Sequence, residues 1–133
     1  MPANAVFLLI RHAEKPESGT GLTPLGERHA QSYAHFFPSY HLGPRLLTIA
    51  ALFAAADTPS SARPRLTLMP LASALKLPIE TRYESKQFGE LAGRLLSKEF
   101  DGRNAVICWK RGEILDLADA LGARARDLRP KTQ

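Results

Sequence analysis

The sequence predicts an α/β fold, a three-layer α/β/α sandwich in which helices cover both faces of a mainly parallel sheet. Short apolar runs alternate along the chain with segments of helical periodicity, which is the pattern of a parallel sheet with crossover helices. The apolar runs are continuous and do not alternate with polar residues, as expected for strands that are buried on both faces. Connections rich in Pro, Gly and Ser separate these segments.

The first predicted elements are a strand and a helix. Residues 6–10, "VFLLI", form the apolar run expected for a buried strand, and the loop "EKPESGTG" follows shortly after it. Thr23 is a suitable N-cap, and Pro24 suits the first helical position because its missing N–H would have no intrahelical partner there. The helix should run over residues 24–37 and stop at Pro38.

The remaining elements follow the same alternation. Pro70 lies inside the second predicted helix, residues 65–75, so that helix must start late or kink. Gly122 should end the last helix as its C-cap. The other predicted elements are strands at residues 51–55, 78–83 and 104–109 and helices at residues 86–100 and 113–121.

Length and composition indicate one domain. The chain of 133 residues is large enough to bury a core, and we expect a domain at residues 1–122 with a basic C-terminal tail at residues 123–133. No apolar run approaches the roughly 20 residues of a membrane span. Cys108 is the single cysteine, which excludes a disulfide framework and a cysteine-rich zinc site and favours a reducing, cytoplasmic location.

Chemically reactive residues follow the predicted strands. In open parallel sheets, ligands bind outside the carboxyl ends of the strands. This rule brings four segments to one edge of the sheet: Arg11 and His12, residues 57–63, residues 83–84, and residues 110–111. A histidine at a strand end is more often structural than catalytic, and the matching groups on the other segments are what favour chemistry here.

Arginines on two of these segments suit a phosphoryl group. The planar guanidinium groups of Arg11 and Arg63 match its oxygens bidentately. A neutral imidazole such as that of His12 is a good nucleophile toward phosphorus when its other nitrogen is held by an acceptor.

Other residues have simpler expected roles. Trp109 should pack at a strand end, although it could also contact a substrate. Cys108, inside an apolar strand, should be buried and inert. His29 should face solvent on the first helix.

Three stretches resemble a known family. "LLIRHAEKP" followed by "LTPLGERHA" is similar to the opening of the histidine phosphatase superfamily, the phosphoglycerate-mutase-like group, with Ala13 where Gly is usual. "SSARPRLTLMPLA" resembles the family's second-arginine segment, with Arg63 and Thr67 at the matching spacing. "AVICWKRGEILDLADALG" resembles its last strand and helix, with Arg111 where the second catalytic histidine belongs. The resemblance covers residues 6–122.

The resemblance implies a phosphoglycerate-mutase-like fold and a set of roles. His12 would become phosphorylated, and Arg11 and Arg63 would clamp the phosphoryl oxygens. Arg111 would contribute to phosphate binding in place of the histidine. Glu84 is the best candidate for the acid that protonates the leaving group, while Glu90 and Glu14 stay open. The family mechanism implies no metal and no cofactor.

These observations favour a phosphoric monoester hydrolase acting on a phosphorylated small molecule or a phosphoprotein, with activity reduced by Arg111. A phosphate-binding pseudoenzyme, which keeps the site but turns over poorly, is the alternative. The formal charge of +5 and the pI near 9.7 leave a nucleic-acid-binding protein as a third and least favoured reading, because no aromatic residues interleave with the basic tail. No membrane partner is expected.

Overall fold

The four-stranded sheet is parallel, where the sequence predicts a mainly parallel sheet. In the computed structural model, which describes residues 5–11, 22–39, 41–42, 45–59 and 61–122, four strands lie in the order β1-β6-β4-β5. Each strand pairs in parallel with its neighbour. The strands are β1 (Phe7–Arg11), β4 (Ile49–Ala54), β5 (Ile79–Glu80) and β6 (Asn104–Trp109).

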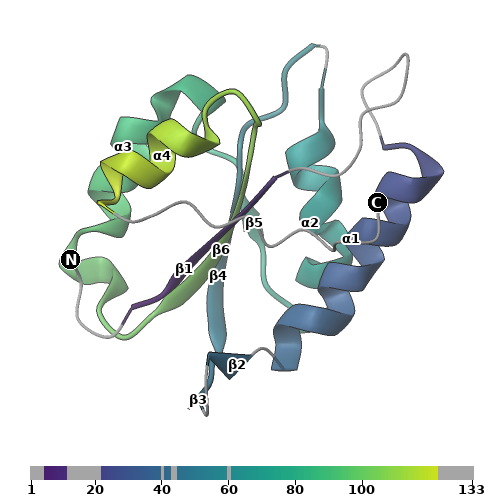
Figure 1. Cartoon of the computed structure of the whole chain (residues 1–133), viewed down its shortest axis with the longest axis horizontal. Helices are drawn as coiled ribbons and strands as arrows, with labels where there is room; N and C mark the ends of the chain where they lie inside the picture. The colour runs from purple at the N-terminus through teal and green to yellow at the C-terminus, as the bar shows by residue number, and fades with distance from the viewer. Residues whose placement is uncertain (1–4, 12–21, 40, 43–44, 60, 123–133) are drawn as a thin grey trace.

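Helices cover both faces of this sheet (Figure 1). The helices α1 (Pro24–Phe36) and α2 (Arg63–Leu75) lie on one face, and α3 (Phe88–Leu95) and α4 (Ile114–Ala120) lie on the other. Three 3-10 turns, η1 (Phe37–Ser39), η2 (Ser85–Gln87) and η3 (Lys98–Phe100), flank α1 and α3. The structure is therefore the predicted three-layer α/β/α sandwich.

The two hydrophobic clusters explain why the strands are continuously apolar. Along β1, Leu8 and Ile10 pack in the cluster that includes residues of α1 and α2, whereas Leu9 packs in the cluster of α3 and α4. Val106 and Cys108 of β6 belong to the first cluster, and Ile107 and Trp109 belong to the second. Since successive side chains of a strand point to opposite faces, both faces need apolar residues.

The start of α1 follows the sequence prediction. The hydroxyl oxygen of Thr23 accepts a hydrogen bond from the Gly26 backbone N–H at 2.9 Å, which caps the helix. The α-helix ends at Phe36, and Phe37 begins η1 with its side chain buried. His29 of α1 is also buried, at 4% exposure, so the expectation that it faces solvent is wrong.

Two of the observed helices differ in extent from the helices predicted from the sequence. Helix α2 begins at Arg63, not at residue 65, and contains Pro70, so a late start was not needed. The predicted helix 86–100 is divided into η2, α3 and η3. Ser97 closes α3 by donating its hydroxyl to the Arg94 carbonyl at 2.6 Å, which satisfies a carbonyl left open at the helix end.

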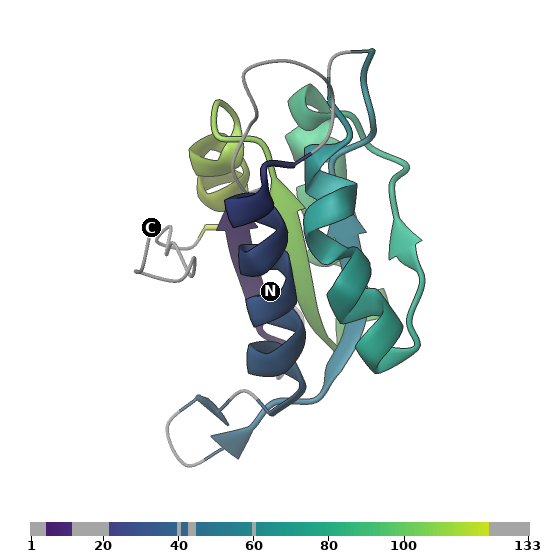
Figure 2. The ribbon, with the colours of Figure 1, turned by 90° about the vertical axis from the view of Figure 1, so that its right-hand side faces the viewer.

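The observed strands differ from the predicted ones in length and in number. The third predicted strand, residues 78–83, is shorter as β5, and the second, residues 51–55, is longer as β4. A two-stranded antiparallel ribbon of β2 (His41–Leu42) and β3 (Arg45–Leu46) has no counterpart in the sequence prediction. It lies at the end of the molecule opposite the carboxyl ends of the sheet strands (Figure 2). Strands of two residues are too short to show a period.

Helix lengths and chain ends complete the description. Within the described part of the chain, no helix has both the length and the hydropathy that crossing a membrane requires. The expected basic tail, residues 123–133, lies outside the described residues, so its boundary with the domain stays a prediction.

Candidate functional site

The described parts of the segments predicted to meet are Arg11, residues 57–59 and 61–63, residues 83–84 and residues 110–111; they lie at or after the carboxyl ends of the parallel strands. These strand ends are uppermost in Figures 1 and 2. Arg11, the last residue of β1, pairs in register with Trp109, the last residue of β6. Ala54, the last residue of β4, pairs with Cys108. Because β1, β6, β4 and β5 are parallel, the chain leaves each of them on the same side.

Hydrogen bonds join the segments that follow these strands. The Ala55 N–H donates to the Cys108 carbonyl at 3.1 Å, and the Ala56 N–H donates to the Tyr83 carbonyl at 2.8 Å. The indole Nε1–H of Trp109 donates to the Ser85 carbonyl at 2.9 Å. The segments after β4 and β5 are therefore joined to each other and to the end of β6.

Arg63 lies at this edge as the first residue of α2, and only 6% of it is exposed. Its backbone N–H donates to the Ser61 hydroxyl at 3.2 Å. Its carbonyl accepts from the buried Thr67 hydroxyl at 2.8 Å. The short loop before it is closed by backbone hydrogen bonds between Thr58 and Ser61. These contacts thus hold the cationic residue Arg63 largely out of water at the start of α2.

The same loop carries a second, solvent-facing cation. Arg65 forms an ion pair with Asp57, with Nη2 and Oδ2 3.0 Å apart. More than a third of each of these side chains is exposed. This pair links the chain just after β4 to the first turn of α2.

The remaining predicted anion-binding residues lie at or just after the ends of β1 and β6. Arg11 is half-buried at the end of β1, and Arg111 is exposed in the turn after β6. His12 directly follows Arg11 but lies outside the described residues, so the geometry of the nucleophile with the three arginines stays a prediction.

The carboxylates considered as proton donors share a local network. Glu84 caps η2: its carboxylate accepts the Gln87 backbone N–H, and its own N–H donates to Gln87 Oε1 at 2.9 Å. Glu90 accepts from Gln87 Nε2 at 3.1 Å. Glu14 lies outside the described residues. The capping role of Glu84 had a sequence signal, since a carboxylate followed three residues later by Gln is typical of a capping box.

Two buried residues at the end of β6 contribute to this edge of the sheet. Trp109 and Cys108 are fully buried, as expected of packing residues in a strand. Burial raises the pKa of the Cys108 thiol, and a hydrogen bond with Thr67 opposes that shift only in part. The thiol therefore stays protonated at neutral pH and has no nucleophilic character.

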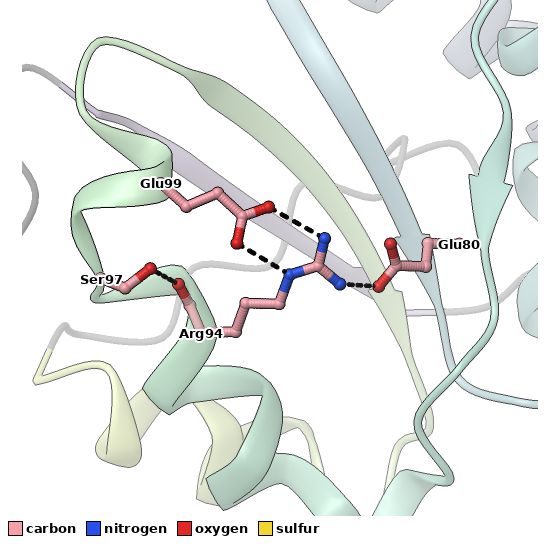
Figure 3. A network of polar contacts seen from close by, with 4 residues as sticks. All are labelled: Glu80, Arg94, Ser97 and Glu99. Atoms are coloured by element: carbon pink, nitrogen blue, oxygen red, sulfur yellow. Dashed lines mark hydrogen bonds and ion pairs between the residues drawn. The ribbon is translucent and has the colours of Figure 1, made fainter.

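One structural network had no signal in the sequence. Arg94 of α3 contacts the carboxylate of Glu80 at the end of β5 and binds Glu99 through two nitrogens, at 3.2 and 3.0 Å (Figure 3). Its guanidinium carbon also lies 5.4 Å from the ring centroid of Phe53. These residues are far apart or irregularly spaced in the chain, so no periodicity predicts their contact. The network fixes the short edge strand against α3.

Other features of the described structure lie apart from these residues. A groove of about 380 Å³ opens between α1 and α2, and none of the predicted site residues lines it. Among the described residues, no group of three or more His, Cys, Asp or Glu side chains could hold a metal ion.

The comparisons identify the fold class. The chain resembles the structure of a Nakamurella multipartitia protein assigned as phosphohistidine phosphatase SixA, with a TM-score of 0.54 and 19% identity. The match covers 84% of this chain and 62% of the other, so the chain spans less than two thirds of that neighbour's length. No family model and no curated protein matches the sequence. The fold is thus phosphoglycerate-mutase-like, as the sequence resemblance implies.

Proposed function

We propose that residues 1–122 form a histidine-phosphatase-like domain that hydrolyses phosphomonoesters or a phosphoprotein through a phosphohistidine at His12. The observation that carries this proposal is the buried Arg63 at the sheet edge where β1 ends in Arg11. The planar guanidinium of Arg63 matches the oxygens of a phosphoryl group bidentately, and its burial would strengthen that charge-assisted contact. The assigned activity of the structural neighbour agrees with a phosphorylated substrate.

The proposed reaction has two displacements at phosphorus. In the first, an imidazole nitrogen of His12 bonds to phosphorus while the bond to the leaving-group oxygen breaks, and a carboxylic acid protonates that oxygen. In the second, water attacks the phosphohistidine, the P–N bond breaks, and phosphate is released. Arg11 and Arg63 would hold the phosphoryl oxygens through both steps, which stabilises the charge on them.

The proton donor is proposed to be Glu84. It follows β5 closely, at the edge to which β1, β4 and β6 also point. Glu90, which shares its hydrogen-bonding partner Gln87, and Glu14 are the alternatives. Glu84→Gln would slow alkyl phosphates more than aryl phosphates if it is the acid, because good leaving groups need little protonation.

The second candidate is a phosphate-binding pseudoenzyme, favoured by the arginine at position 111. Arg111 is exposed in the turn after β6, where the resembling family carries its second histidine. A permanent cation there would bind phosphate in the ground state, and ground-state binding does not speed the chemical step.

A single experiment separates the two candidates. The protein is incubated with an aryl phosphate and quenched in alkali, which preserves phosphohistidine, and phosphate release is measured in parallel. We expect slow turnover with a phosphohistidine that His12→Asn abolishes. Phosphate binding without turnover and without a phosphohistidine would establish the pseudoenzyme. An absence of both binding and turnover would contradict both candidates.

A further inference from the structure

Three exposed or half-buried cations lie beside the candidate site and belong to none of its proposed machinery. Arg82 and Lys86 lie between β5 and α3, and both are exposed; Lys110 directly follows β6 and is half-buried. We call these three residues the cationic rim. The hydrogen bond from Trp109 Nε1 to the Ser85 carbonyl, 2.9 Å long, brings their two chain segments together.

The charges of the cationic rim are not neutralised within the fold. No described residue forms an ion pair with Arg82, Lys86 or Lys110, whereas Arg65 pairs with Asp57 and Arg94 pairs with two glutamates. In the segment that carries Arg82 and Lys86, Glu80 pairs with Arg94, and Glu84 and Glu90 accept amide hydrogens of Gln87.

The ring of Tyr83 supports one member of the rim. The guanidinium carbon of Arg82 lies 5.7 Å from the centroid of that ring. Contact with an aromatic face leaves the edge of a guanidinium able to donate hydrogen bonds to another group. Uncompensated cations beside a site raise the local concentration of anions and speed their association.

Resting on the proposed function, we propose that the cationic rim binds acidic side chains next to the phosphorylated residue. The substrate is then a phosphorylated, acidic protein segment and not an isolated phosphate ester. The phosphoryl group itself is assigned to Arg11, Arg63 and Arg111, so the rim is available to neighbouring carboxylates. Nucleic acid fits less well, because single strands bind by stacking on exposed aromatic rings. Here Trp109 is fully buried and Tyr83 is half-buried beneath Arg82.

The test is a binding measurement that does not depend on turnover. Two fluorescent peptides of equal length carry the same non-hydrolysable phosphonate in place of phosphoserine, flanked by Asp in one and by Ser in the other. Their dissociation constants are measured by anisotropy at low and at physiological salt. The test variant is Lys86→Gln with Lys110→Gln. The matched control is Lys76→Gln with Lys98→Gln. Lys76 is the C-cap of α2, and Lys98 is the first residue of η3, so neither lysine belongs to the cationic rim.

We expect the wild-type protein to bind the acidic peptide about fivefold more tightly than the neutral one at low salt, with a smaller preference at physiological salt. The rim variant should lose most of this preference, and the control variant should retain it. Equal binding of the two peptides, or equal loss of the preference in both variants, would overturn the proposal. So would tighter binding of a single-stranded oligonucleotide than of either peptide.

Failure of the proposed function gives a different result. Phosphate release from the corresponding phosphoserine peptides and from an aryl phosphate is measured on the same samples. If none is hydrolysed while the acidic peptide is still preferred through Lys86 and Lys110, the rim proposal holds and the hydrolase proposal fails. If hydrolysis occurs without any preference for the acidic peptide, the hydrolase proposal holds and the rim proposal fails.

Discussion

At position 111 the chain carries a permanent charge at the edge of the candidate site. An arginine is longer than a histidine, cannot release a proton, and presents its donors in a fixed plane. Its exposure after β6 leaves it free of packing that would hold it in one place. A displacement of about 1 Å can remove much of the benefit of positioning in catalysis.

We therefore predict that Arg111→His raises kcat and weakens inhibition by phosphate. The reason is that the arginine stabilises bound phosphate more than the transition state. Steady-state assays of the two proteins on an aryl phosphate, with phosphate as the competing ligand, measure both effects. Arg28→His, which changes an exposed arginine of α1 away from the candidate site, serves as the control. A slower Arg111→His protein would show that Arg111 takes part in catalysis.

A second prediction at the residue scale concerns Cys108. Its thiol is fully buried, and that burial raises its pKa. Since the thiolate is the reactive form, iodoacetamide at pH 8 should leave the folded protein unmodified over hours and modify it completely in denaturant. Mass spectrometry of the intact protein gives the readout. Rapid native alkylation would mean that the strand β6 opens readily near its end.

At the scale of elements, the edge strand β5 depends on Arg94. Two residues of strand offer few backbone hydrogen bonds, and Arg94 adds contacts to Glu80 and Glu99. The paired Arg94 lowers the pKa of the Glu99 carboxyl, and the paired glutamates raise the pKa of Arg94. The Glu99 side chain is 44% exposed, so its pairing is screened by water and salt.

The pH dependence of this network has a defined sign. A carboxyl whose pKa is lower in the folded state stabilises the protein above its ordinary pKa, 4.5 for this glutamate, and loses that stabilisation as the pH falls through the lower folded value. Glu99→Gln should therefore unfold in less urea than wild type at pH 7, and the difference should shrink below pH 4.

Arg94→Leu should destabilise more than Glu99→Gln, because it leaves Glu80 without its cation and removes the contact with Phe53. We expect a loss of roughly 1–2 kcal/mol. Arg28→Leu, at an exposed position of α1, is the matched control and should change the free energy of unfolding little. Equal effects of the two substitutions would show that the Arg94 contacts do not stabilise β5.

At the scale of the whole molecule, three arginines from three segments are expected to act on one anion. Phosphate or sulfate should bind and raise the melting temperature, more so at low ionic strength because salt screens the attraction. Isothermal calorimetry at two salt concentrations tests this. Absence of phosphate binding at low salt would contradict both the hydrolase and the pseudoenzyme.

Arg63→Ala should weaken phosphate binding by at least about tenfold, since it removes a charge-assisted, bidentate contact. Arg65→Ala is the matched control: the residue lies on the same helix, but its guanidinium pairs with Asp57. Circular dichroism establishes that both variants are folded. If both weaken binding equally, the effect is one of general charge and Arg63 has no specific role.

Much of the fold could be predicted from the sequence because its signals are local. Residues 105–109 are apolar without interruption, and the structure places all of β6, including Asn104, in the interior. Thr23 and Pro24 mark the start of α1, since capping depends on neighbours a few residues away. The order of the apolar runs and helices was enough to predict a parallel sheet whose strand ends share one edge.

Contacts between distant segments were decided by the tertiary structure alone. His29 is buried although its position in the sequence suggested solvent, because α2 packs beside α1. The sequence placed Trp109 at a strand end but did not indicate that its indole would bind the Ser85 carbonyl, and nothing in the spacing of Arg94 indicated Glu80. The sequence was enough to predict the strands of the main sheet, the helices beside them and the chemical groups that follow the strands. Which groups contact each other depends on how the layers pack, because the spacing between the layers is set by the side chains of all of them together.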